Sequence, residues 1–119
     1  MRKTETENIA MICRILSVET RVRILHLLNG RYLCVGVLAS RLDITQGAVS
    51  QHLRILKDAR LVIAEKRGYY VHYCLNDKTM SKWAEQLSGF LHKSPGPQCI
   101  RKENRQCVMK RKSAKNRKT

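Results

Sequence analysis

One segment of the sequence, residues 46–59, combines side chains that can read DNA bases with helical spacing. At about 100° per residue, its apolar residues share one arc of a helix. The opposite arc carries Gln46, Gly47, Ser50, Gln51, Arg54 and Lys57. Glutamine can pair with adenine through two hydrogen bonds, arginine can do the same with guanine, and serine can bond base edges or phosphates. The segment therefore predicts a helix that lies in a major groove with its polar arc toward the bases.

Two runs of β-forming residues, 62–66 and 69–75, are predicted to form a hairpin with two cations, Lys66 and Arg67, at its tip. Only Arg67 and Gly68 separate these runs, which is the length and glycine content of a tight hairpin. Long cations at a hairpin tip can reach phosphates or a minor groove. Of the three tyrosines in the second run, we expect at least two to pack the hairpin against the domain.

Five cysteines could do redox or metal chemistry. They are Cys13, Cys34, Cys74, Cys99 and Cys107, and their odd number and wide spacing favour reduced thiols over a disulfide framework. Cys34 could join Cys99 or Cys107 in a site for a metal or metalloid, or two of the five could form a redox switch. The same thiols could also be packing groups, since buried cysteine often acts as a small hydrophobe. The sequence leaves these three possibilities open, and the cofactor unknown.

The elements that would position these side chains can be predicted from apolar periodicity. Helices are expected over residues 6–16, 18–29, 34–41, 46–59 and 77–93. Thr45 can cap the fourth helix, and His52 on its apolar arc is expected to be buried and hydrogen-bonded. With the hairpin before the final helix, the order is α-α-α-α-β-β-α. This order describes a mainly α fold with a β-hairpin wing, the winged helix-turn-helix.

Several stretches resemble the ArsR/SmtB family of bacterial and archaeal repressors, in the same order, between residues 9 and 92. They are residues 20–25 (TRVRIL), 33–35 (LCV), 47–53 (GAVSQHL), 61–62 (LV) and 68–73 (GYYVHY). The resemblance implies a homodimer joined through its first and last helices, with two recognition helices in successive major grooves of a palindromic operator. The apolar stripes of those two helices agree with a dimer, because a small domain has little interior to bury both. The expected interface residues are Ile9, Ile12, Leu16, Met80, Trp83, Leu87 and Leu91.

The resemblance also implies release from DNA when a metal, metalloid or oxidant reaches thiol or imidazole ligands. The family's arsenic motif, similar to ELCVCDL, aligns with residues 32–38. Cys34 matches its first thiol, but Gly36 replaces the second thiol and Val37 replaces the aspartate. A tight soft-metal site needs about three or four ligands, so the arsenic site is broken within this motif. A second family site on the last helix is expected to be absent, because the carboxylates and the histidine there lie too far apart along the helix.

Charge is the unusual feature of the composition. The 119 residues include 24 Lys and Arg against 9 Asp and Glu, a net charge of +15, which attracts nucleic acid and other polyanions. Nine of the basic residues and one acidic residue lie within 94–119. We expect a DNA-binding and dimerisation domain over residues 1–93 and a flexible basic tail over 94–119 that adds salt-sensitive affinity. With no spanning segment or signal peptide apparent, the expected compartment is the cytoplasm.

Other functional classes fit the sequence less well. A non-specific RNA- or nucleoid-binding protein without a ligand switch would explain the charge, but not the glutamines and serine of segment 46–59. An interaction module with this fold would not need DNA. Catalysis is not expected, because no Ser/His/Asp set, paired-carboxylate motif or phosphate-cradling glycine loop appears. We therefore expect a sequence-specific transcriptional repressor with double-stranded DNA and a second copy of itself as partners. A thiol-reactive effector stays open as the signal for release.

Overall fold

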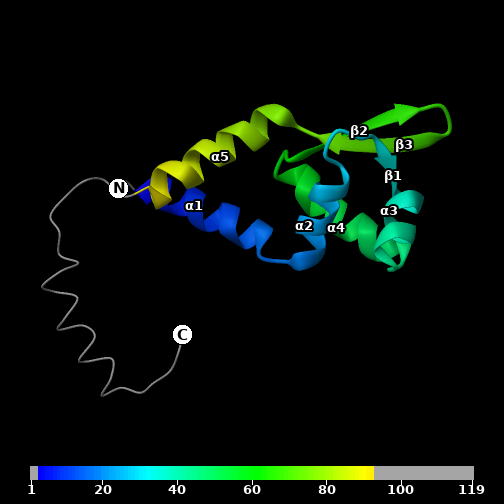
Figure 1. Ribbon diagram of the computed structural model, residues 1–119, viewed down its shortest axis with the longest axis horizontal. Coiled ribbons are helices and arrows are strands. Elements are labelled where there is room, and N and C mark those ends of the chain that lie inside the picture. Colours follow the sequence, from blue (N-terminus) through cyan, green and yellow to red (C-terminus); the bar gives the residue numbers. More distant parts are fainter. Residues whose placement is uncertain (1–2, 93–119) are drawn as a thin grey trace, which may run out of the picture.

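The computed structural model describes residues 3–92, which form a domain of helices with one antiparallel sheet (Figure 1). In chain order the elements are α1 (Lys3–Leu16), α2 (Glu19–Leu27), β1 (Leu33–Cys34), α3 (Val35–Leu42), α4 (Gln46–Asp58), β2 (Val62–Arg67), β3 (Tyr70–Leu75) and α5 (Asp77–Leu91). The expected winged helix-turn-helix is confirmed: α3 and α4 form the helix-turn-helix, and β2 and β3 form the wing. Within the described part of the chain, no helix is long and apolar enough to cross a membrane.

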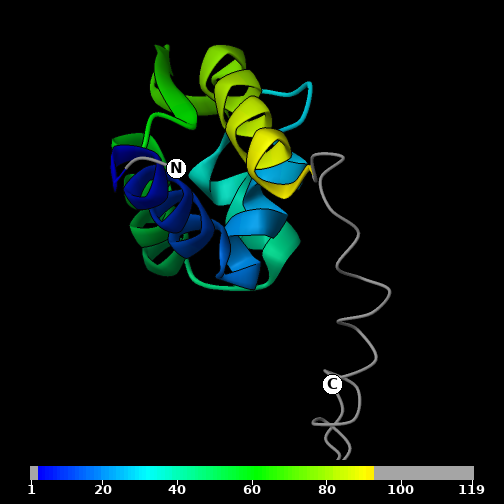
Figure 2. The same ribbon diagram turned by 90° about the vertical axis from the view of Figure 1, so that its left-hand side faces the viewer.

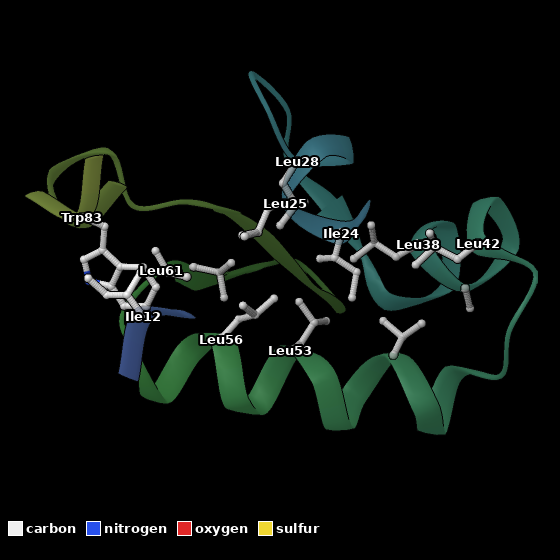
Figure 3. Packing of buried hydrophobic residues seen from close by; sticks show 13 residues of the cluster. Ile12, Ile24, Leu25, Leu28, Leu38, Leu42, Leu53, Leu56, Leu61 and Trp83 are labelled. Carbon is white, nitrogen blue, oxygen red and sulfur yellow. The ribbon is translucent and has the colours of Figure 1, made fainter. Parts of the chain in front are cut away.

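The hydrophobic core lies along one side of α4 (Figure 3). Leu53 and Leu56 point from α4 into this core, where Leu38 of α3 and Ile24 of α2 meet them. At about 25 cal/mol per Å² of buried apolar surface, such a cluster is the main source of stability in a domain of this size. One face of α4 is thus fixed against the core, and its opposite face is left for another role.

The turn between α3 and α4 is short because two local devices end one helix and start the next. Asp43 ends α3 in the left-handed region (φ 58°), and the N–H of Ile44 donates to the carbonyl of Ala39 at 3.2 Å. Thr45 precedes α4, and its Oγ1 accepts a hydrogen bond from the N–H of Ala48 at 3.1 Å. The expected cap at Thr45 is confirmed, and α4 therefore begins at Gln46.

The sheet has the strand order β1-β3-β2, and β1 was not expected from the sequence. Leu33 pairs with Tyr73 and Cys34 pairs with His72, so β1 lies antiparallel beside β3. A strand of two residues is too short to show the alternation by which strands are predicted. Cys34 consequently ends a strand and precedes α3, which begins one residue later than expected.

The loop of the hairpin lies one residue later in the sequence than expected. Arg67 is the last residue of β2 and pairs with Tyr70, so the loop consists of Gly68 and Tyr69 rather than Arg67 and Gly68. Gly68 has φ 65°, which suits glycine at the first loop position of a tight hairpin. Because of this shift, Tyr69 rather than Arg67 stands at the tip of the wing.

Candidate nucleic-acid interface

The polar arc of α4 is fully on the surface. The expected DNA-reading residues Gln46, Gly47, Ser50, Gln51, Arg54 and Lys57 are all exposed. On the opposite arc, Val49, Leu53 and Leu56 are at most 1% exposed. The helix therefore presents a continuous face of hydrogen-bonding groups and cations, held in orientation by the core behind it.

His52 departs from its expected environment. Its side chain is half-buried, as its place on the apolar arc predicts. However, its Nδ1 atom is buried and has no hydrogen-bond partner among the described residues. The expected burial of His52 is thus partial, and its Nδ1 does not make the expected hydrogen bond.

Of the two wing cations, only Lys66 projects freely into solvent. Both Lys66 and Arg67 are exposed, but the guanidinium carbon of Arg67 lies 4.0 Å from the centroid of the Tyr32 ring. Arg67 also lies 3.5 Å from a carboxylate oxygen of Glu65. The sequence placed Arg67 at the tip as a phosphate contact, whereas in the structure it flanks the tip loop and stacks on Tyr32.

The wing tip carries aromatic side chains that sequence reasoning had assigned to packing. Tyr69 is 99% exposed and Tyr70 is 65% exposed, and only Tyr73 packs against the core. The expectation that at least two of these three tyrosines pack against the domain is therefore wrong. The cause is the shifted loop, which puts Tyr69 at the tip, and the pairing of Tyr70 with Arg67 on the outer side of the sheet.

The wing and α4 lie in one region of the molecule. In Figure 1 the wing tip, α3 and the N-terminal end of α4 lie at the end of the domain away from the free ends of α1 and α5. A helix with an exposed polar face and a projecting hairpin beside it can contact a major groove and the adjacent backbone together. The geometry is thus that of a DNA-binding surface.

A second surface, along α1, α2 and α5, is apolar. Figure 2 looks at the molecule from the free ends of α1 and α5 and shows these two helices in front. Leu16, Met80 and Leu87 line an open hollow of about 460 Å³, with Val22 and Leu25 of α2. Phe90 and Leu91 at the end of α5 are 49% and 67% exposed. Phe90 and Val22 were not among the expected interface residues, although both add to the apolar surface.

Three of the expected dimer-interface residues are already buried within one chain. Ile12 is 0% exposed, Trp83 is 8% exposed and Ile9 is 9% exposed. Ile12 and Trp83 meet at one end of the core (Figure 3). They are core residues of the single chain. They can stabilise a dimer interface only indirectly, by packing behind the residues that lie on the surface.

The thiols in the described part of the chain are free. Cys13 is exposed, while Cys34 and Cys74 are half-buried. Cys99 and Cys107 lie outside the described residues, as does the whole expected tail 94–119.

The described residues do not form the family's metal site. They contain no group of three or more His, Cys, Asp or Glu that could hold a metal ion. A Cβ at Gly36 would lie 4.0 Å from the Cys34 Sγ and 3.7 Å from the Gln46 Nε2. Gly36 therefore leaves Cys34 without the second thiol that the motif would supply.

The chain is similar in sequence and in fold to known transcription regulators. Residues 19–64, from α2 into β2, match the family model described as bacterial regulatory protein, arsR family. The transcriptional repressor SdpR of Bacillus subtilis is 29% identical over 82 residues, which cover 69% of this chain and 91% of SdpR. A homolog of the cadmium resistance transcriptional regulatory protein CadC from Staphylococcus aureus is 31% identical over 93 residues, covering 77% of this chain and 75% of that protein.

A solved structure extends the likeness to the fold. The transcriptional activator HlyU of Vibrio cholerae is 33% identical over 87 residues, covering 73% of this chain and 80% of HlyU. A structure of HlyU from the same organism superposes with a TM-score of 0.59 at 31% identity and covers 78% of this chain and all of that one. These relatives are transcription regulators and not enzymes, in agreement with the expectation that the chain has no catalytic role.

Proposed function

Because the chain belongs to the ArsR family of DNA-binding bacterial transcription regulators, we propose that it acts as a homodimeric repressor that reads a palindromic operator with α4. The observation that carries this proposal is the division of α4 into two faces. One face is locked into the core by Val49, Leu53 and Leu56, and the other is entirely exposed and polar. A rigidly backed helix of this kind can hold base-contacting side chains at fixed positions in a major groove.

The exposed side chains divide into two roles. Gln51 and Arg54 can each make two hydrogen bonds to one base, and so they would set the sequence preference. Lys57 on α4 and Lys66 on the wing would contact phosphates, which gives affinity and salt dependence without specificity. Gln46 and Ser50 complete the polar face, and Gly47 allows close approach of the backbone at the start of α4. Tyr69 would add a neutral contact to the sugar-phosphate backbone at the wing tip.

The apolar surface near α1 and α5 supports the dimer. Exposed apolar patches of substantial area on small proteins mark contact sites, and here the patch combines the hollow beside Leu16 with the exposed ends of Phe90 and Leu91. A twofold dimer through this surface would carry two copies of α4 at its far ends. Such a pair fits half-sites about one helical turn of DNA apart.

A thiol-reactive effector is the proposed signal for release, and Cys34 is its first candidate. Among the relatives, the CadC homolog is named for cadmium resistance, whereas the names of HlyU and SdpR mention no metal. In this chain a metal or metalloid site would need Cys34 together with Cys99 or Cys107, because the described residues supply no set of three donors.

Selection of bound duplexes from sheared genomic DNA tests the proposed function. We expect the bound fraction to share an inverted repeat, with half-site centres about 10–10.5 base pairs apart or a multiple of that spacing. Recovery of fragments without a shared sequence would favour the non-specific nucleic-acid-binding alternative. A reporter placed behind the selected site should lose expression when the protein is present. A rise in expression would contradict repression while leaving operator binding intact.

A further inference from the structure

Two cysteines that are distant in the sequence share one face of the sheet. Cys34 on β1 lies directly opposite His72 on β3, and Cys74 lies two residues further along β3. Directly opposite residues and residues two apart on a strand point to the same side of a sheet. The side chains of Cys34, His72 and Cys74 therefore lie on one face, with Cys34 and Cys74 as diagonal neighbours on adjacent strands.

This face is the outer side of the sheet. Ile63, which pairs with Cys74 from β2, is 45% exposed, whereas Val62, on the other face of β2, is 2% exposed. Cys34 and Cys74 are both free and half-buried. Neither residue is fully buried, and neither belongs to the cluster of buried core residues.

The spacing of the two thiols suits a bond that forms only when the sheet adjusts. Diagonal residues of an antiparallel pair have Cα atoms about 7–8 Å apart. A relaxed disulfide spans about 4.4–6.8 Å between Cα atoms. Because β1 and β3 are already paired, joining Cys34 to Cys74 requires β1 to slide along β3. Because Cys34 immediately precedes α3, that movement would be transmitted to the helix-turn-helix.

His72 lies directly opposite Cys34 and two residues before Cys74 on β3, on the same face of the sheet as both thiols. Its Nδ1 is buried and has no hydrogen-bond partner among residues 3–92. Glu65 faces it from β2 on the same side of the sheet.

We propose that Cys34 and Cys74 form a dithiol site that two-electron oxidants such as hydrogen peroxide convert to a disulfide. The Cys34 thiolate attacks one peroxide oxygen, which gives a sulfenic acid and, with one proton, releases a water molecule. The Cys74 thiolate then attacks the Cys34 sulfur and displaces hydroxide, which leaves as a second water. In sum, two thiols and one peroxide give one disulfide and two waters.

Peptide mapping of the full-length protein tests the site directly. The reduced protein is treated with one equivalent of hydrogen peroxide, alkylated and cleaved with trypsin, and linked peptides are identified by mass spectrometry. Cleavage after arginine and lysine places Cys34 in peptide 32–41 and Cys74 in peptide 68–78, each as the sole cysteine. We expect these two peptides to be the dominant linked pair.

Single substitutions control the assignment. The link should vanish in Cys34→Ala and in Cys74→Ala, and it should persist in Cys13→Ala, which removes an exposed thiol elsewhere. Circular dichroism checks that each variant keeps its helix content. A link from Cys34 to Cys99 or Cys107, or oxidation of Cys34 without any bridge to Cys74, would overturn the proposal.

The effect on DNA binding rests on the proposed function and is measured separately. Oxidised wild-type protein should bind its operator at least fivefold more weakly than reduced protein, and dithiothreitol should restore the affinity. Cys74→Ala should show no such change. If the disulfide forms but the affinity stays constant, the site has no regulatory effect. If the reduced protein has no operator, the proposed function fails and the peptide map is unaffected.

Discussion

The guanidinium of Arg67 stacks on the ring of Tyr32, 4.0 Å from its centroid. Arg67 is the last residue of β2, and Tyr32 directly precedes β1 at the other edge of the sheet. The contact therefore crosses the outer face of the sheet and ties the wing to the segment that leads into α3. Orientation of the wing relative to the helix-turn-helix depends on this brace as well as on the strand pairing.

Loss of the brace should weaken DNA binding modestly. An exposed cation–π contact contributes about 0.5–1 kcal/mol, so Tyr32→Ala should lower operator affinity by about two- to fivefold. Tyr32→Phe keeps the ring and should bind as the wild type does. Affinity is measured by fluorescence anisotropy over a range of salt concentrations. A gain in affinity with a steeper salt dependence would instead mean that Arg67 serves DNA better when it is released.

Tyr69 should contribute to affinity without changing the salt dependence. A hydrogen bond from its hydroxyl to a phosphate is a bond to a charged group, worth about 1.5–3 kcal/mol, so Tyr69→Ala should cost about tenfold or more. No counterion is released by a neutral side chain, so the slope of affinity against salt should stay constant.

Two variants complete that experiment. Tyr69→Phe removes only the hydroxyl and so shows how much of the affinity depends on its hydrogen bond. Lys66→Ala should reduce the slope of log affinity against log salt concentration by about one unit. Equal DNA affinity of the wild type and Tyr69→Ala would show that Tyr69 makes no contact with DNA.

Arg60, which follows α4, has a strained backbone conformation that can be tested by substitution. It has φ 66°, and the N–H of Leu61 donates to the carbonyl of Leu56 at 2.9 Å in the manner of a glycine-capped helix end. A side chain in the left-handed region costs roughly 1–2 kcal/mol, part of which glycine loses again through its freer unfolded state. Arg60→Gly should therefore raise the free energy of unfolding by about 0.5–1 kcal/mol in a urea titration. Arg60→Ala, which keeps the strain, should give no such gain.

The dimer should depend on the apolar end of α5. Phe90→Glu places a charge on a residue that is 49% exposed in one chain, next to Leu91 at 67%. If a second copy covers this surface, the buried charge should shift the protein toward monomer in sedimentation-velocity runs. Ile63→Glu is the matched control, because Ile63 is similarly exposed at 45% but lies on the sheet. A monomeric wild type, or a dimer unaffected by Phe90→Glu, would contradict this interface.

Much of the fold follows from local signals. Periodicity located the helices, and Thr45 located the start of α4 because a cap is a local device. The two faces of α4 were likewise correct, since they depend only on helical geometry and on which residues are apolar. The short strand β1 could not be predicted, because its two residues form a strand only through pairing with β3, forty residues away.

The candidate site could be predicted only in part, because some of its features depend on local helical geometry and others depend on strand pairing. The exposure of the α4 residues followed from the helix, but the roles of Arg67 and Tyr69 depended on a hairpin register that differed by one position. Such a shift exchanges the residue at the tip for its neighbour. The proximity of Cys34 and Cys74 is also a product of strand pairing and has no signal in the linear sequence.

The central claim is that α4 reads a specific DNA sequence. Its most direct test is the ratio of affinities for the selected operator and for a scrambled duplex of equal length and composition, measured at one physiological salt concentration. The account predicts a ratio of about 10³ or more, and a marked fall in that ratio for Arg54→Ala, because a base contact is lost. A wild-type ratio near one would show that the polar face of α4 reads no sequence, and would contradict the account.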